Sequence, residues 1–346
     1  MLAAIYVFHR RLAGKISASG LARVADSWGI KMERRHFLTG VATFLAAPVA
    51  AASSVFAPGA IPVIDTHVHL LEPGRPQGVP WSGPKGQPPQ LALPHTYRAQ
   101  ISGTGITGAI VVEASSWIED NLWILERAAS DPLFVGVVGS LNPSHPEFGA
   151  YLNRFSKHPL WRGIRYARVW MDDSGKQVLK PGMADGLKLL AQTGQTLDMA
   201  NPSFELLRGA LLAMDAAPNL KVVMDHMPSL DPTPQTQALY DSLIAELAQR
   251  PNFFIKLSQV MHKDGDNRTV TAPRARLDRL MAALGEDRVM FGGDWPNSVG
   301  TATIAQAVTH MQDYFAARPR MQAEKYFWRN SQAIYRWTRR DAAQPI

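Results

Sequence analysis

The chain has 346 residues, of which 46% are hydrophobic, and this length can bury the core of one large barrel or of two ordinary domains. It contains no cysteine, which excludes disulfides, iron–sulfur clusters and thiolate metal sites, so histidine, carboxylate or other oxygen ligands must hold any metal ion. The formal net charge is +7, but residues 1–60 carry seven Lys or Arg against two Asp or Glu, a net of +5. The other 286 residues hold only +2, so we expect no nucleic-acid partner.

The front of the chain is typical of an export signal. Twin arginines, Arg34 and Arg35, precede an apolar stretch over 40–52 and then small residues that suit a signal peptidase. This order predicts a twin-arginine-type signal peptide over 32–57, the twin-arginine export machinery as a partner, and a periplasmic or otherwise exported protein. A short buried helix over 40–52 is the alternative.

Residues 1–31 fit no part of such a signal, so we interpret Met32 as the true start and the preceding segment as an upstream or unstructured extension. An amphipathic arm is the alternative for this segment. Pro48 interrupts an apolar run that is shorter than the roughly 20 residues needed to cross a bilayer, so no stable membrane span is expected.

Beyond residue 60, short apolar runs alternate with amphipathic stretches, which is the pattern of parallel strands joined by crossover helices. Eight such runs predict an α/β protein, a single-domain (β/α)8 TIM barrel over 61–337 that is followed by a C-terminal tail over 338–346. An open doubly wound sheet is the rival fold, but no Gly-x-Gly-x-x-Gly fingerprint follows any strand. The expected strands are 62–70, 108–115, 134–142, 161–168, 195–202, 221–229, 253–260 and 289–297.

Apolar residues that recur every three or four positions predict the helices between the strands. A stretch rich in Pro and Gly over 72–94, which contains Trp81, predicts instead a long irregular loop over the mouth of the barrel. The expected helices are 118–130, 183–193, 204–216, 236–250, 273–284, 304–316 and 323–336, the last two of which close the barrel.

The first strand carries two imidazoles at alternate positions. Side chains alternate along a strand, so Asp65, His67 and His69 share one face. The two histidines lie about 6.6 Å apart, from a rise of roughly 3.3 Å per residue, and can converge on one divalent cation. Asp65 lies deeper and is expected to support them. Because an isolated His-x-His pair is more often structural, its interpretation depends on the other strand ends.

Two further ionisable side chains end later strands. His226 ends the sixth strand and Asp294 ends the eighth, which neighbours the first strand in a closed barrel. Gly292 and Gly293 leave room for the close approach of that strand. A lone buried histidine is usually a core residue and a lone aspartate often caps a turn, but their coincidence with the histidine pair favours a metal or catalytic centre.

These motifs resemble the amidohydrolase superfamily, specifically the amidohydrolase-related branch that contains sugar-lactone lactonases and 2-pyrone-4,6-dicarboxylate lactonase. The resemblance covers about residues 61–337. The His-x-His pair with the aspartate of strand eight is moderately specific for the superfamily, whereas Gly-Ile-Arg and Asp-Trp-Pro narrow it to the branch. The resemblance rests on Asp65-Thr-His67-Val-His69, Pro80-Trp81, Val135-Gly-Val-Val-Gly139, Gly163-Ile-Arg165, Asp225-His226, Phe291-Gly-Gly-Asp294-Trp-Pro296 and the segment 330–335.

By that resemblance, the metal ligands are His67, His69 and Asp294, the catalytic residues are Asp294 and His226, and the cofactor is one divalent metal, zinc or manganese. Many superfamily members add a Lys or His from strand four or five, but those strands end here in 165–168 and 198–201, which contain neither residue type. A bridged two-metal site is therefore not expected. The branch also contains lactonases that bind no metal, so a metal-free centre stays open.

Other strand ends supply candidates for substrate contact, and each has a structural alternative. Glu113 suits a substrate hydroxyl or a salt bridge at the rim of the barrel. Arg165 suits a bidentate grip on a carboxylate or ring oxygen, or a pair with a neighbouring carboxylate. Trp81 is a further candidate, and Asn201 and Lys256 are weaker ones.

Three functions compete. The first is a metal-dependent hydrolase that opens a cyclic ester, either a sugar-acid lactone or a pyrone or aromatic-degradation lactone, by attack of an activated water. The second is a metal-dependent non-oxidative decarboxylase of the same superfamily, and the third is a non-catalytic solute-binding barrel. The Gly-Ile-Arg motif and the Trp81 loop favour the lactonase, so we expect a hydrolase that acts on a carboxylic ester bond of a small molecule.

Overall fold

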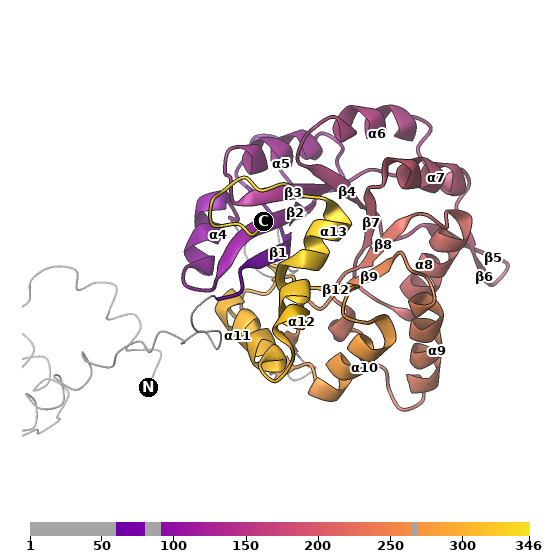
Figure 1. Ribbon diagram of the computed structural model, residues 1–346. Helices are drawn as coiled ribbons and strands as arrows, with labels where there is room; N and C mark the ends of the chain where they lie inside the picture. Colours follow the sequence, from indigo (N-terminus) through magenta and orange to yellow (C-terminus); the bar gives the residue numbers. More distant parts are fainter. Residues whose placement is uncertain (1–59, 80–90, 264–268) are drawn as a thin grey trace, which may run out of the picture. The chain divides into compact units, whose positions relative to one another are not determined.

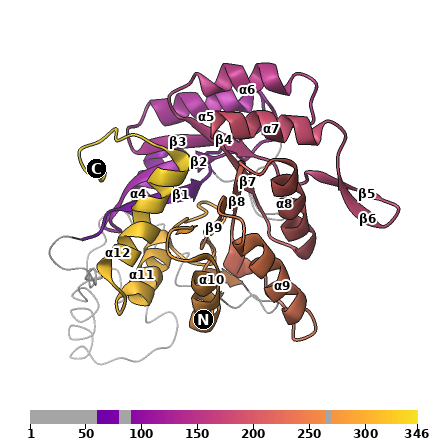
Figure 2. The same cartoon turned by 45° about the vertical axis from the view of Figure 1, so that its right-hand side comes forward.

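The structure, a computed structural model, describes residues 60–79, 91–263 and 269–346. Eight strands within these ranges form one parallel sheet in chain order, with helices around them (Figures 1 and 2). Each lies within one of the predicted runs or begins at most two residues before it, so the predicted barrel strands are confirmed. The strands are β1 (Val63–Val68), β2 (Ile106–Val112), β3 (Phe134–Gly139), β4 (Trp161–Arg165), β7 (Thr196–Met199), β8 (Lys221–Met224), β9 (Phe253–Lys256) and β12 (Val289–Met290).

The sheet nearly closes between its last strand and its first. After β12 the chain continues beside β1, where Val68 and Trp295 form a parallel bridge. The backbone N–H of Asp294 donates to the carbonyl oxygen of His67 at 2.8 Å, and that of His69 donates to Trp295 at 2.8 Å. The result is the nearly closed parallel barrel expected of the TIM type, with the end of strand eight beside the histidine pair.

The barrel strands are buried on both faces, because helices cover the outside and side chains fill the inside. Every residue of β1 and β3 is buried, and both sequences are nearly continuous apolar runs apart from the polar face of β1. Burial of Asp65 and His67 among these side chains means that polar groups in β1 need partners inside the barrel.

The predicted helices are present, although several begin or end a few residues away from the expected positions. The last expected helix is a continuous helical run that contains a π-helical turn over Lys325–Arg329. The helices are α4 (Pro94–Ile101), α5 (Asp120–Ala129), α6 (Phe148–Ser156), α7 (Met183–Thr193), α8 (Phe204–Ala216), α9 (Gln237–Ala248), α10 (Arg274–Leu284), α11 (Ile304–Phe315), α12 (Arg320–Glu324) and α13 (Asn330–Tyr335), with a short 3-10 turn over Met227–Ser229.

Two helices and two hairpins were not predicted. Helices α4 and α6 are short, and α4 buries only Tyr97 and Ile101, which leaves too weak an apolar period to detect. An antiparallel hairpin of β5 (Trp170–Asp173) and β6 (Lys176–Leu179) projects beside α8 (Figure 1), and β10 (Met261–Lys263) pairs with β11 (Thr269–Thr271). The first hairpin turns at Ser174 and Gly175, both at positive φ, which is the usual geometry of a two-residue hairpin turn.

Several predicted segments lie outside the described residues. These are the extension over 1–31, the export signal over 32–57 and the loop residue Trp81. Among the helices that the structure describes, none is long and apolar enough to cross a membrane.

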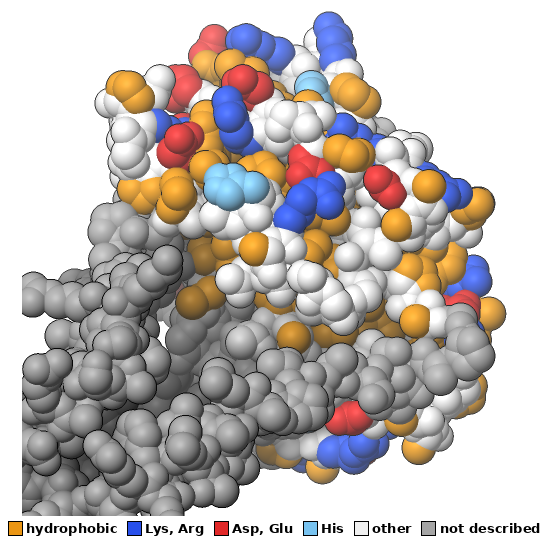
Figure 3. All heavy atoms as spheres, turned by 90° about the vertical axis from the view of Figure 1, so that its left-hand side faces the viewer, with side chains coloured by type: hydrophobic (Ala, Val, Ile, Leu, Met, Phe, Trp, Pro, Cys, Tyr) orange, Lys and Arg blue, Asp and Glu red, His pale blue; other side chains and the backbone are white. Residues whose placement is uncertain are grey.

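The tail beyond residue 337 packs across the start of β3. Arg340 Nη1 donates to the carbonyl oxygens of Phe134 at 2.6 Å and Ala128 at 3.0 Å, and Gln344 Nε2 donates to Pro132 at 2.8 Å. On the face drawn in Figure 3, the acidic and basic side chains of the described residues are interspersed rather than gathered by sign.

Two helical glycines provide a matched test of the packing around the barrel. A Cβ at Gly186 of α7 would lie 2.0 Å from the carbonyl oxygen of Pro143, whereas a Cβ at Gly149 of α6 would meet only the Leu189 Cδ1 atom at 3.7 Å. We expect Gly186→Ala to lower the free energy of unfolding by about 1–3 kcal/mol, because backbone cannot move aside cheaply. Gly149→Ala should raise it by about 0.5–1 kcal/mol. Denaturant unfolding measures both, and equal effects would contradict this packing.

Candidate active site

Strand β1 places its two histidines edge to face at the mouth of the barrel. The Nε2 atoms of His67 and His69 lie 3.2 Å apart, with ring planes at 81°. His69 Nδ1 lies 2.9 Å from the carbonyl oxygen of Val112, which can only accept, so Nδ1 carries the hydrogen. The lone pair of His69 therefore sits on Nε2 and faces His67.

Asp294 completes this group from the end of strand eight. Its Oδ1 atom lies 3.4 Å from His69 Nε2 and 3.6 Å from His67 Nε2. The carboxylate is held in place by two amides, because Gln259 Nε2 donates to Oδ2 at 2.5 Å and Asn297 Nδ2 donates to Oδ1 at 3.1 Å. The two Nε2 atoms and Asp294 Oδ1 thus lie 3.2–3.6 Å from one another. A cation bound between them would stabilise this arrangement.

His226 approaches the same carboxylate from the end of β8. Its Nε2 atom lies 3.8 Å from Asp294 Oδ1, and its ring centroid lies 4.5 Å from that of His67. Nδ1 lies 2.8 Å from the hydroxyl oxygen of Ser258, which orients the ring. The structure therefore brings His226 to the three residues of the first and last strands.

The backbone turns sharply at the ends of four consecutive barrel strands. The backbone φ values are 61° at Asn201, 59° at His226, 53° at Gln259 and 53° at Asp294. These values lie in the left-handed region, which residues other than glycine rarely adopt. Such a conformation costs of the order of 1–3 kcal/mol per residue and is concentrated at functional sites. His226 and Gln259 both contact Asp294 at the centre, and Asn201 lines the cavity above it.

The centre holds the protonation states that a metal site needs. Burial lowers the pKa values of His67 and His226, in spite of nearby carboxylates, so both imidazoles are neutral at pH 7. Burial alone would raise the pKa of Asp294, but the positive charge that the imidazoles of His226, His67 and His69 carry when protonated at low pH outweighs it, so this pKa lies well below its usual range. Neutral imidazoles and an ionised carboxylate are the forms that bind metal ions.

The donor set fits a divalent cation. One ligand atom from each of His67, His69 and Asp294 lies within 4.8 Å of the others, and all three residues are buried. Two imidazole nitrogens and a carboxylate oxygen are a common set for zinc and also suit manganese. The donor set is therefore of the kind that could hold the divalent ion implied by the resemblance.

Beneath the histidines, Asp65 joins the first strand to the last. Its Oδ1 atom accepts from the backbone N–H groups of His67 at 3.0 Å and Gly293 at 2.7 Å, and Tyr97 donates its hydroxyl hydrogen to Oδ2 at 2.7 Å. A Cβ at Gly293 would lie 2.4 Å from Oδ2, so only glycine permits this approach. Asp65 therefore supports the histidine pair from below, as its position in the strand predicts.

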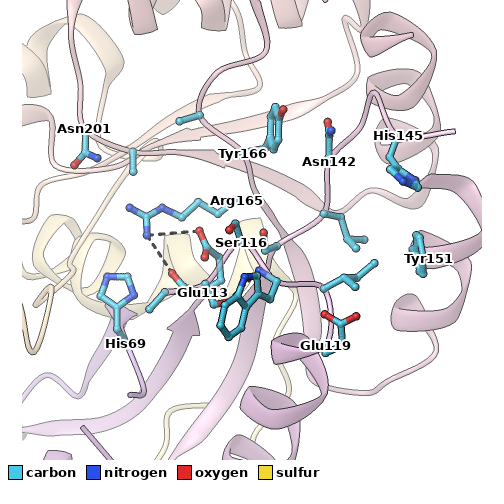
Figure 4. Close-up of a pocket in the computed structure, with 18 of the residues that line it drawn as sticks. His69, Glu113, Ser116, Glu119, Asn142, His145, Tyr151, Arg165, Tyr166 and Asn201 are labelled. Atoms are coloured by element: carbon cyan, nitrogen blue, oxygen red, sulfur yellow. Dashed lines mark hydrogen bonds and ion pairs between the residues drawn. The ribbon is translucent and has the colours of Figure 1, made fainter. Parts of the chain in front are cut away.

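A cavity of about 1130 Å³ opens above His69 and extends to α6 (Figure 4). Glu113, Arg165 and Asn201, which were candidates from the sequence, line it near His69. Arg165 Nη1 donates to the backbone oxygen of Glu113 at 3.1 Å and lies 3.9 Å from its carboxylate Oε1. The pairing considered for these two residues is therefore observed, and because both also line the cavity, their contact with a substrate stays a prediction. The far end is lined by Asn142, His145, Phe148, Tyr151, Trp117 and Glu119.

Lys256 is not placed as the sequence suggested. It was a weak candidate for substrate contact, but its side chain is wholly buried and does not line the cavity. Its Nζ atom lies 2.9 Å from Asp198 Oδ2 and 3.0 Å from Asp225 Oδ1. Strand β9 directs this side chain into the barrel interior, so only an ion-pair role is available to it there.

Sequence reasoning missed Gln259, Ser258 and Asn297, which hold Asp294 and His226 in place. The signal for the first two was present, because both directly follow the apolar run of strand seven, where side chains reach the mouth of a barrel. Amides and hydroxyls carry no charge, however, and a search for ionisable groups passes over them.

The fold and the centre together define a class. The protein is a parallel eight-stranded barrel with a buried group of imidazoles and a carboxylate at the carboxyl ends of its strands, where barrel enzymes have their active sites. A family profile described as amidohydrolase matches residues 64–337, and the chain therefore belongs to that family. The predicted resemblance and the predicted class of hydrolase are confirmed.

Three known proteins illustrate the relationship. An L-fucono-1,5-lactonase from Burkholderia ambifaria is 25% identical over 269 residues, which cover 73% of this chain and 84% of that protein. An amidohydrolase from Burkholderia multivorans, crystallised with bound zinc, has a TM-score of 0.69 at 20% identity over 80% of this chain and all of its own. A dihydroxybenzoic acid decarboxylase from Polaromonas, crystallised with manganese and 2-nitroresorcinol, has a TM-score of 0.55 at 17% identity over 80% of this chain and 97% of its own. The two structural similarities establish the fold.

Removal of one hydroxyl tests the support beneath the centre. Tyr97→Phe keeps the ring in contact with Trp295 but leaves the buried carboxylate of Asp65 without one of its three donors. We expect the free energy of unfolding to fall by about 1–3 kcal/mol. Tyr151→Phe, whose hydroxyl bonds Glu147 at 3.3 Å on the surface, is the matched control and should change it by less than about 0.5 kcal/mol. Equal losses in denaturant unfolding would refute this role.

Proposed function

We propose that this protein opens the ring of a cyclic ester, a lactone, by hydrolysis that depends on one divalent metal ion. The observation that carries the proposal is the convergence of the buried side chains of His67, His69 and Asp294, of which His69 lines an open cavity. The similarity to an L-fucono-1,5-lactonase supports a lactone as the substrate. The same centre would hold the zinc or manganese ion through these three side chains.

When bound, such an ion lowers the pKa of a water molecule and polarises the ester carbonyl. The two oxygens of Asp294 have separate tasks. Oδ1 faces the histidines and completes the ligand set, whereas Oδ2, fixed by Gln259, accepts the proton of the attacking water and returns it to the leaving alkoxide. The low pKa of Asp294 keeps the carboxylate ionised and ready to accept.

His226 is suited to stabilise the oxyanion that forms on the carbonyl. The hydroxyl of Ser258 donates to Nδ1 in the tautomer that we assign, so Nε2 carries the hydrogen and directs it toward the centre. Because burial lowers the pKa of His226, the imidazole is a neutral donor throughout the reaction and adds no charge that would compete with the metal.

The charge of the cavity supports an uncharged, hydroxylated lactone rather than one that carries carboxylates. Among the described residues that line the cavity, Arg165 is the single Lys or Arg. Its guanidinium lies 3.9 Å from the carboxylates of both Glu113 and Asp225. A positive charge that is already matched by two carboxylates offers little to an anionic substrate, while Glu113 and Asn201 suit ring hydroxyls.

For location, we propose export. The support is the order of twin arginines, apolar stretch and small residues over 32–57, which suits the twin-arginine machinery.

A panel of lactones tests the substrate class. We expect kcat/KM to be at least about tenfold higher for neutral hydroxylated lactones than for carboxylated lactones of similar size, because like charges at close range cost several kcal/mol. Glu113→Gln should reduce the ratio of kcat/KM between neutral and carboxylated lactones. Glu119→Gln, at the far end of the same cavity, should leave this ratio nearly unchanged. A preference for carboxylated lactones would overturn the proposed class.

Loss of the carboxylate and loss of the metal test the reaction. We expect Asp294→Asn to lower kcat/KM by about 10²–10⁴-fold, and Asp313→Asn on the exposed side of α11 to leave it unchanged. A chelator should abolish acid release, and zinc or manganese should restore it. Acid release that survives chelation in metal-free protein would exclude the metal, and release of CO2 from an acid substrate would instead identify a decarboxylase.

A further inference from the structure

A second group of potential ligands lies on the other side of His67. One ligand atom from each of His67, Asp225 and His226 lies within 4.8 Å of the others, and all three residues are buried. The first group directs the Nε2 atom of His67 toward Asp294, whereas Nδ1 of the same ring faces Asp225 Oδ1 at 3.6 Å. This second group is already accompanied by a cation, the ammonium group of Lys256.

The ammonium group of Lys256 lies between two carboxylates and beside the ring of His67. Its Nζ atom lies 2.9 Å from Asp198 Oδ2, 3.0 Å from Asp225 Oδ1 and 3.3 Å from His67 Nδ1. The ammonium group hydrogen-bonds to Asp198 and forms an ion pair with Asp225, whereas His67, whose one lone pair faces the first group from Nε2, is a close neighbour of the ammonium group rather than a third acceptor. The side chain is inaccessible to solvent, and the ring centroid of Tyr335 lies 5.6 Å from Nζ.

The carboxylate of Asp198 is itself fixed toward the ammonium group. Tyr335 donates its hydroxyl hydrogen to Oδ2 at 2.7 Å, and Thr196 donates to Oδ1 at 2.7 Å. Without Lys256, Asp198 would be an uncompensated negative charge inside the barrel and Asp225 would keep only the Arg165 guanidinium at 3.9 Å, and buried charges persist only when they are paired or bind a metal ion. These ligands therefore require a cation at this position, and the chain supplies it.

We propose that the ammonium group of Lys256 occupies a second cation position in this centre and so limits the protein to one divalent metal ion. The inference rests on the proposed metal site formed by His67, His69 and Asp294. Carboxylate oxygens that bind an ammonium group are also ligands of divalent metals, so removal of the lysine exposes a site for a second ion. A purely structural ion pair predicts loss of stability on removal but no second ion.

Metal stoichiometry tests this inference without any assay of activity. The full chain is saturated with zinc, separated from free ion by gel filtration, and analysed for zinc per chain by mass spectrometry. We expect one equivalent in the wild type and two in Lys256→Met. The double variant Lys256→Met with Asp198→Asn should return to one, because it lacks a ligand of the second position. Lys221→Met, which removes a half-buried lysine that bonds the carbonyl oxygen of Ile334, is the control and should stay at one.

The outcomes separate this inference from the proposed function. A second equivalent in the wild type, or a folded Lys256→Met that binds no more zinc than the wild type, overturns the role of Lys256. Absence of zinc from the wild type contradicts the proposed metal site. In that case, zinc bound by Lys256→Met but not by the wild type would still support the role of Lys256, and no zinc in either would refute it. If Lys256→Met does not fold, Lys256→Gln, which keeps a polar group without the charge, replaces it in the same measurement: a second equivalent of zinc supports the role of Lys256, and one equivalent refutes it.

Discussion

The contact on which the site depends is the backbone pairing between the first strand and the segment after the last. Asp294 N–H donates to the carbonyl oxygen of His67, and Asp65 binds the N–H groups of both segments. These bonds fix the height of the aspartate relative to the histidine pair. Because a shift of one residue would turn every side chain to the opposite face, the geometry of the centre is a consequence of barrel closure.

The interior of the barrel contains several buried charged side chains, and they are stable there because they have partners. Lys256 binds Asp198 and Asp225, and Asp294 is held by amides and faced by imidazoles. Replacement of one member would leave an unpaired charge, which is far more costly than replacement of the whole group. The same network that could serve a metal ion therefore also determines which polar residues the core tolerates.

The barrel by itself does not determine the reaction. The same architecture is shared by a zinc-bound amidohydrolase and a manganese-bound decarboxylase, at identities of 20% and 17%. What distinguishes such proteins is the lining of the cavity above the strand ends, because side chains there contact the substrate. In this chain the arginine that lines the cavity, Arg165, is paired with two carboxylates. The charge of the substrate, rather than the fold, is therefore the property that this lining selects.

The sequence by itself determined the eight strands, most of the helices and the convergence of His67, His69, His226 and Asp294, because strand period and strand order place the ends of strands at one face. It did not reveal the partners of these residues. Gln259 and Ser258 are ordinary polar residues in the chain, and Lys256 looked like a substrate contact until its direction into the barrel was known. Hydrogen bonds and ion pairs join residues distant in sequence at distances of about 3 Å, and only the tertiary structure sets those distances.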